Sequence, residues 1–187
     1  IDKVIGPAAV ADVSLTTAKT APEAIALWDE QLFSEVRGYP RTVYLHDQRL
    51  IFGGTKDIPN RFIATNSGEF FRFDLGAGDD GDAIDKTIVS RQIVEIIGFS
   101  SFQKLQIFTA RQEFFIDIGT KGAITPGPGN MSFEKQTAYG SSYVKPVEFD
   151  GATLFVTKSG NKVREFLYND LRNAFTARNI TAVSSEI

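Results

Sequence analysis

The chain has 187 residues, of which 42% are hydrophobic and 23% charged, so it can form one domain or a piece of a larger one and is not wholly disordered. Its formal net charge of -3 argues against binding driven by nucleic-acid phosphates. The lack of cysteine excludes disulfides, thiolate zinc sites and cysteine nucleophiles, and it fits a reducing cytosol.

The sequence carries no sign of a membrane span or secretion signal. No apolar run approaches the length of about 18 residues that a span needs, and the N-terminus lacks a basic-then-apolar pattern. We therefore expect no membrane insertion in this segment. A start at Ile1 instead of Met indicates either processing or a piece excised from a longer polypeptide.

Residues 1–36 are predicted to form a lead-in segment with one short helix. Thr20 and Glu23 have the spacing of a capping box, and Pro22 suits the first helical turn. Apolar residues, including Trp28, then recur at near-helical spacing. The pattern predicts a helix over about 21–33.

A β domain is predicted over 37–175, because the pattern changes there to short alternating runs bounded by turn residues. Sixteen phenylalanines suit half-buried strands. The closing residues 176–187 are predicted to be a truncated continuation. The predicted strands are 41–46, 49–53, 61–65, 69–74, 87–99, 103–109, 113–118, 131–138, 143–149, 152–157 and 162–168.

The first hairpin of this domain has the clearest pattern. Alternation predicts that Val43 and Leu45 point inward while Tyr44 and His46 point outward. The pair Asp47-Gln48 predicts a tight turn before the second strand.

Three similar segments recur at intervals of about 50 residues: LIFGGT (50–55), LQIFTA (105–110) and LFVTKS (154–159). An aromatic strand follows each of them within about a dozen residues. Antiparallel units of four strands and 40–50 residues are typical of β-propeller blades. We expect an all-β fold that forms a partial β-propeller of about three blades, and a β-sandwich stays open as the alternative.

No residue is predicted to be catalytic, to bind a cofactor or to bind a metal. The single histidine, His46, lacks a visible constellation of base and nucleophile, so an exposed structural role is favoured. The acidic loop Asp79-Asp80-Gly81-Asp82 is the best calcium candidate, but its ligand spacing is wrong and a solvated turn is favoured. Paired acids for sugar hydrolysis stay possible, with none singled out.

Five arginines lie in or beside the predicted strands and are candidates for subunit contacts, because arginine is enriched at protein interfaces. Solvated strand ends are the alternative explanation. The five are Arg37, Arg41, Arg49, Arg91 and Arg164.

The segment RGYPRTVYLHDQRLIFGGTKDIPNRFIATNSGEFFRFD (37–74) resembles a segment of phage tail proteins that reads R-G-[YW]-P-x-x-V, then Q-x-R-L-x-F-G-G, then a strand ending G-[DE]-F-F-x-F. The pieces YGSSYVKPV (139–147) and LFVTKSGNKVREFLYN (154–169) are similar to that family in the same order. The family is that of tail tubular protein B, the nozzle protein of short-tailed phages and related prophages. The resemblance covers roughly residues 37–180, and residues 1–30 carry no match.

The resemblance implies a structural virion protein built around a β-propeller and assembled in the host cytoplasm. Such subunits form a ring, usually hexameric, below the portal and adaptor, and they can support tail fibres. DNA passes through the ring and is not bound specifically, which a near-neutral or acidic wall favours. Family members are much longer, so this chain would be an internal portion.

Two other functions stay open at this stage. A carbohydrate-binding or glycoside-hydrolysing propeller predicts acids gathered with Tyr39, Tyr44 or Trp28 around one pocket. A plain protein-interaction module without a virion role is the third possibility.

Overall fold

The computed structural model describes residues 32–102, 104–169, 171–172 and 174–183. The helix expected over about 21–33, with Trp28, lies outside this part of the chain except for its last two positions. The described residues form twelve β-strands and one 3-10 turn at Thr181–Val183. The strands are β1 (Thr42–His46), β2 (Arg49–Gly53), β3 (Arg61–Ala64), β4 (Ile84–Thr87), β5 (Ile96–Ser100), β6 (Gln106–Thr109), β7 (Glu113–Asp117), β8 (Ser132–Thr137), β9 (Val147–Phe149), β10 (Ala152–Val156), β11 (Val163–Asn169) and β12 (Ala174–Asn179).

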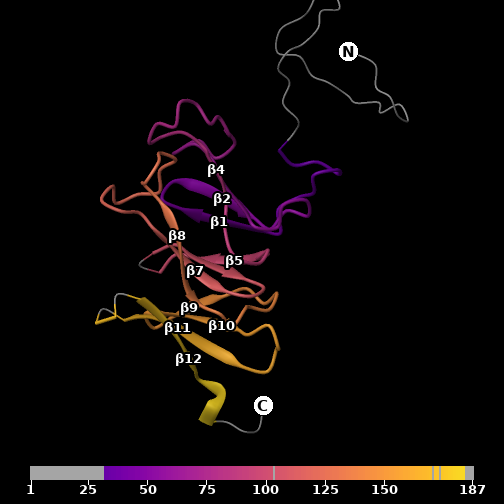
Figure 1. The fold of residues 1–187 in the computed structure, drawn as a ribbon, viewed down its shortest axis with the longest axis vertical. Coiled ribbons are helices and arrows are strands. Elements are labelled where there is room, and N and C mark those ends of the chain that lie inside the picture. The colour runs from indigo at the N-terminus through magenta and orange to yellow at the C-terminus, as the bar shows by residue number, and fades with distance from the viewer. Residues whose placement is uncertain (1–31, 103, 170, 173, 184–187) are drawn as a thin grey trace, which may run out of the picture. The chain divides into compact units, whose positions relative to one another are not determined.

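The strands form three antiparallel sheets, each made of four strands that are consecutive in the chain (Figure 1). The first sheet is β1–β4, the second β5–β8 and the third β9–β12. Tight turns connect neighbours: Asp47 and Gln48 have φ values of 45° and 59°, which closes the β1–β2 hairpin as a two-residue turn. Asp150 and Gly151, with φ values of 47° and 80°, do the same between β9 and β10.

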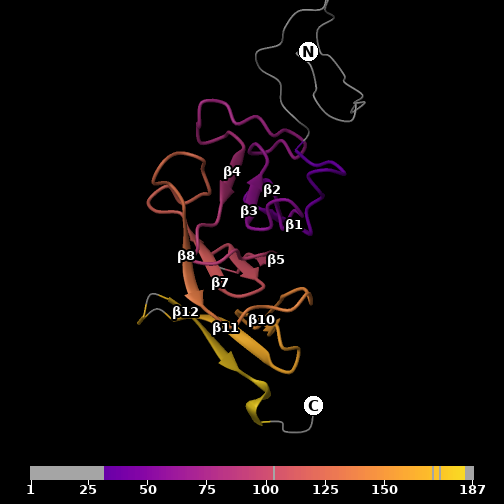
Figure 2. The same cartoon turned by 45° about the vertical axis from the view of Figure 1, so that its right-hand side comes forward.

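Strands β5, β6 and β7 of the second sheet are buried on both faces because their side chains alternate between two cores. Ile107, Phe114 and Ile116 pack into a cluster shared with the first sheet. Their neighbours Phe108 and Phe115 point the other way, into a cluster shared with the third sheet. Strict alternation along β6 and β7 therefore stacks the three sheets in chain order (Figure 2).

The core between the second and third sheets is aromatic. Phe166 is fully buried and stacks on Phe175, with ring centroids 4.7 Å apart and planes inclined by 7°. Phe108 and Phe155 pack around Phe166 with centroids at 5.5 and 6.2 Å. Phenylalanine-rich strands thus supply large apolar area at the contact between these two sheets.

Two glycines allow consecutive sheets to approach closely. Gly54, which follows β2, has a φ of 73°, and a Cβ atom there would lie 2.3 Å from the carbonyl oxygen of Ile96 on β5. Gly140, ahead of β9, has a φ of 72°, and its Cβ would lie 2.5 Å from the carbonyl oxygen of Ala110. Both positions require glycine for conformation and for space.

The fold is all-β with three stacked four-stranded meanders, and it has the character of a partial β-propeller. The first strands of the sheets, β1, β5 and β9, are edge strands that meet, and direct contacts join β1 to β5. The three sheets differ from the two-layer β-sandwich considered as the alternative. Among the described residues, no helix is long and apolar enough to cross a bilayer.

Two strand predictions for the first two sheets were wrong. Residues 69–74 form turns in which the amide of Asn66 bonds the carbonyl oxygen of Arg72, and Phe71 is 92% exposed. The fourth strand of the first sheet is β4, which pairs with β3. The long strand expected over 87–99 is in fact the end of β4, a loop and the start of β5.

The predicted orientation of β1 was also wrong. Val43 and Leu45 are 53% and 58% exposed, whereas Tyr44 packs against the core of the first and second sheets. The alternation itself is present, but it is Tyr44 and His46 that face inward. The last strand, β12, was not predicted, and it extends the third sheet to Asn179.

Candidate functional site

The three first strands meet at a single carboxylate, that of Glu148 on β9. Its Oε1 atom accepts hydrogen bonds from the hydroxyl groups of Tyr44 (3.0 Å) and Ser100 (2.8 Å) and from the backbone amide of Ser101 (3.0 Å). The Ser100 hydroxyl also lies 3.2 Å from that of Thr153 on β10. One oxygen atom thereby connects β1 and β9 with the end of β5, and all three sheets share it.

The environment fixes the charge of this carboxylate. The hydrogen bond from the backbone amide of Ser101 is the main cause of the lowered pKa of Glu148. Hydrogen bonds from the hydroxyl groups of Ser100 and Tyr44 lower this pKa further, while partial burial raises it. Burial, together with the nearby negative charge, raises the pKa of Tyr44. At neutral pH Glu148 is therefore an ionised acceptor and Tyr44 a neutral donor. This arrangement suits a structural junction better than acid catalysis, which needs a protonated acid.

A second polar cluster lies just ahead of the same strands. Arg41, which precedes β1, pairs with Glu95, which precedes β5, at 2.9 Å. Tyr143, in the segment that leads to β9, donates its hydroxyl hydrogen to Glu95 (3.1 Å), and its ring lies under the Arg41 guanidinium at 4.6 Å. The two clusters hold the three first strands together at two levels along their length.

Two pockets adjoin these clusters. One, of about 630 Å³, is lined by Tyr39, Arg41 and Glu95 among others. The other, of about 380 Å³, lies between β1 and β5 and is lined by Tyr44 and Tyr143 among others. Each described pocket has at most one acidic side chain in its lining, whereas glycoside hydrolysis by the usual route needs two carboxyl groups.

The five arginines predicted to contact other subunits occupy different environments. Arg37 pairs with Asp57 at 2.9 Å, and Arg41 with Glu95. Arg91 is exposed. Arg164 donates to the carbonyl oxygen of Ala177 (2.8 Å) and lies 3.4 Å from the centre of the Tyr139 ring.

Arg49 is buried within its own chain, with only 2% of its surface exposed. Its guanidinium donates to the carbonyl oxygens of Thr65, Asp80 and Asp82, each at 2.6 Å. It therefore anchors the loop between β3 and β4 and presents little surface to a neighbouring subunit.

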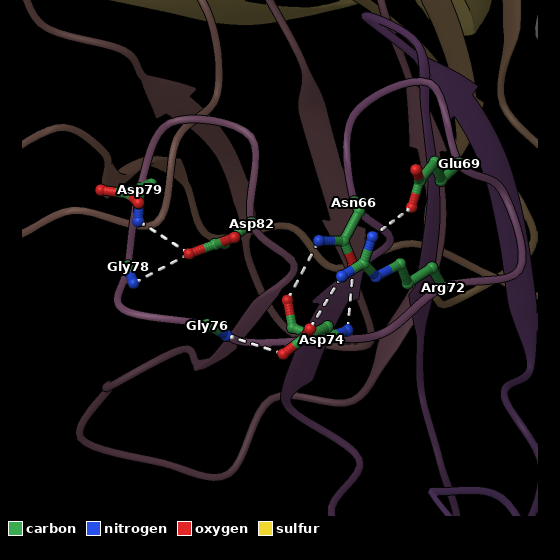
Figure 3. Close-up of polar contacts among 8 residues, drawn as sticks. All are labelled: Asn66, Glu69, Arg72, Asp74, Gly76, Gly78, Asp79 and Asp82. Carbon is green, nitrogen blue, oxygen red and sulfur yellow. Dashed lines mark hydrogen bonds and ion pairs between the residues drawn. The ribbon is translucent and has the colours of Figure 1, made fainter.

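In the acidic loop, the Asp82 carboxylate accepts backbone amides of its own turn (Figure 3). Oδ2 of Asp82 accepts the amides of Gly78 (3.0 Å) and Asp79 (2.8 Å), and Arg72 pairs with Asp74 at 3.0 Å. Asp80 pairs with Lys121 at 2.9 Å. Within the described residues, no three acidic or histidine side chains gather as a metal would require.

His46 lies at the end of β1 with 14% of its side chain exposed, so it is more buried than predicted. Burial lowers its pKa, and the carboxylate of Asp47, 3.2 Å from Nε2, opposes this. The adjacent Asp47 is the partner that the structure shows. In the part of the chain that the structure describes, no hydroxyl group bonds to the His46 ring.

Sequence reasoning missed Glu148, Glu95 and Tyr143. Their partners lie 47 to 104 residues away in the chain, so no local motif marks them. The signal that could have found them is their place in the repeat: Glu95 and Tyr143 lie ahead of the first strand of a sheet, and Glu148 lies in such a strand.

No family model matches the chain, and neither does any curated protein.

Proposed function

We propose that this chain is a structural, non-enzymatic part of a bacteriophage tail, a portion of a nozzle subunit of the tail tubular protein B type. The ordered resemblance over residues 37–180 supports this function, and the three repeated sheets fit the propeller that the resemblance implies. In this role the subunits assemble as a ring, usually hexameric, in the virion. Adaptor and fibre proteins are its neighbours, and DNA passes through the ring without specific binding.

The observation that carries the proposal is an uncovered apolar face on the third sheet. Val147 and Phe149 on β9 and Leu167 on β11 share the face opposite the aromatic core and are 59%, 67% and 42% exposed. An apolar sheet face of this kind is typical of a contact surface for another protein layer. Three stacked sheets do not close a propeller, so a further sheet or a neighbouring subunit would cover this face.

The charge of the chain fits a conduit. The net charge is -3, and Arg37, Arg41 and Arg49 are paired within the chain. Each phosphate captured by a basic side chain would slow the movement of DNA. No observation among the described residues favours the glycosidase alternative, because neither pocket gathers two carboxyl groups.

Mass photometry and negative-stain images of the chain test this proposal, both for the chain alone and within any longer polypeptide that contains it. We expect rings of uniform size. The double variant Phe149→Ser, Leu167→Ser should reduce assembly, because it makes the proposed contact face polar.

Phe71→Ser is the matched control, because Phe71 is 92% exposed but lies in a loop of the first sheet. Rings that persist in the double variant would rule out the third sheet as a contact face. Single copies at every concentration, both alone and in the longer polypeptide, would contradict the proposed function.

A further inference from the structure

The larger pocket is unusual for an acidic protein because most of the charged residues in its lining are basic. Four of these residues are basic, namely Arg41, Lys56, Arg111 and Lys158, and one, Glu95, is acidic. Its volume of about 630 Å³ lies in the range of small-molecule sites. A net positive pocket in a chain of net charge -3 attracts anions locally.

Three of these cations are available to a ligand. Arg41 already pairs with Glu95, which neutralises the only acidic side chain of the lining. Lys56, Arg111 and Lys158 are exposed, and the described residues include no hydrogen-bond or ion-pair partner for their side chains. The pocket therefore presents three uncompensated positive charges.

These cations occupy equivalent positions in the three sheets. In each sheet a buried threonine lies at the end of the second strand or just after it. This threonine donates its hydroxyl hydrogen to a backbone carbonyl of the turn that follows. The basic residue of the pocket comes one or two positions after the threonine. The threonines are Thr55, Thr109 and Thr157, with donor–acceptor distances of 2.9, 2.6 and 3.3 Å. The repeat thus brings one cation from each sheet to a common place.

The backbone holds two of the cations in position. The amide of Lys158 bonds the carbonyl oxygen of Gly140 at 2.9 Å, and the amide of Arg111 bonds the hydroxyl of Thr109 at 3.4 Å. Lys56 packs so closely on Gly38 that a Cβ atom on this glycine would lie 2.6 Å from that of Lys56. Since the turns are fixed, binding has to order the three side chains but not the backbone that carries them.

We propose that this pocket binds a small molecule that carries two or more linked phosphate groups. Three cations from separate turns match several charged oxygens better than one carboxylate, and Arg111 can bond phosphate oxygens in a bidentate manner. Tyr39 and Ile93, 63% and 72% exposed, add an apolar wall for any non-phosphate part of the ligand. The inference is independent of the role in the tail.

Isothermal titration calorimetry of the chain with tripolyphosphate tests this site. ADP and a single-stranded oligodeoxynucleotide are titrated separately for comparison. We expect saturable binding with one site per chain, weakened by added salt. Arg111→Gln and Lys158→Gln should each reduce the affinity about tenfold. Stronger binding of ADP than of tripolyphosphate would also support the site and would show that the ligand is a nucleotide, whereas stronger binding of the oligonucleotide than of both would contradict a small-molecule ligand.

Lys135→Gln is the matched control, because Lys135 is an exposed lysine on β8 that does not line the pocket. Its affinity should equal that of the unmodified chain, and far-ultraviolet circular dichroism checks that every variant is folded. The proposal is overturned if tripolyphosphate does not bind, if Lys135→Gln weakens binding as much as Lys158→Gln, or if an acidic peptide binds more tightly than every phosphate probe.

Discussion

Replacing Phe166 by alanine tests whether the second and third sheets share one core. The side chain is fully buried, and three phenylalanine rings, those of Phe108, Phe155 and Phe175, surround it at centroid distances of 4.7 to 6.2 Å. Loss of a buried phenyl group typically costs about 3–5 kcal/mol in the free energy of unfolding. In a chain of this size that corresponds to a fall in melting temperature of about 6–20 °C.

The assay is urea and thermal unfolding followed by circular dichroism, with two companion variants. Phe166→Leu keeps most of the apolar volume and should lose less than about 1.5 kcal/mol. Leu167→Ala changes the next residue, which is 42% exposed on the opposite face, and should lose less than about 1 kcal/mol. If Phe166→Ala is no more destabilising than Leu167→Ala, the stacked-sheet core is wrong.

Three further predictions follow from buried or shared polar groups. Arg49→Met leaves three backbone carbonyls without their donor, so it should lower the free energy of unfolding by about 2–4 kcal/mol, measured by urea titration. A loss below about 0.5 kcal/mol would show that Arg49 does not anchor the loop. Burial raises the pKa of Glu113 above its ordinary value of 4.5, so its contribution to stability is present below that pH and is lost as pH rises through the folded-state pKa. Glu113→Gln should therefore gain stability relative to the unmodified chain as pH rises from 4.5, and a constant difference would contradict this. Glu148→Gln should lower the pKa of Tyr44, because it removes the negative charge that helps to raise it. The pKa of Tyr44 is read from a tyrosinate absorbance titration, as the difference between variants with and without Tyr44→Phe. An unchanged pKa would mean that the two side chains do not meet.

The strands that sequence alone predicted correctly are those in which alternation and turn residues agree. The β1–β2 hairpin combines an alternating run with the turn at Asp47-Gln48, and both appear in the structure. Alternation does not reveal which side is covered, because that depends on the sheet packed against it. This is why the face of Tyr44 was assigned to the wrong side.

Composition misled the prediction where tertiary pairing decides the structure. The aromatic stretch 69–74 resembles a strand, yet its backbone bonds are made within turns. The short polar strand β4 has little strand character, but it pairs fully with β3, and Asp85 forms an ion pair with Arg61 across the two strands. Contacts of this kind are invisible in a local window.

The sharing of one Glu148 oxygen by all three sheets has a consequence for the order of events during synthesis. Tyr44 emerges from the ribosome 104 residues before Glu148, and the strands of the first two sheets are complete by Thr137. Sequential emergence lets those sheets form early. Their first strands nevertheless lack the common acceptor until β9 arrives, so a released fragment that ends before residue 148 is expected to hold two sheets joined by their shared core, with the hydroxyl groups of Tyr44 and Ser100 lacking the carboxylate acceptor.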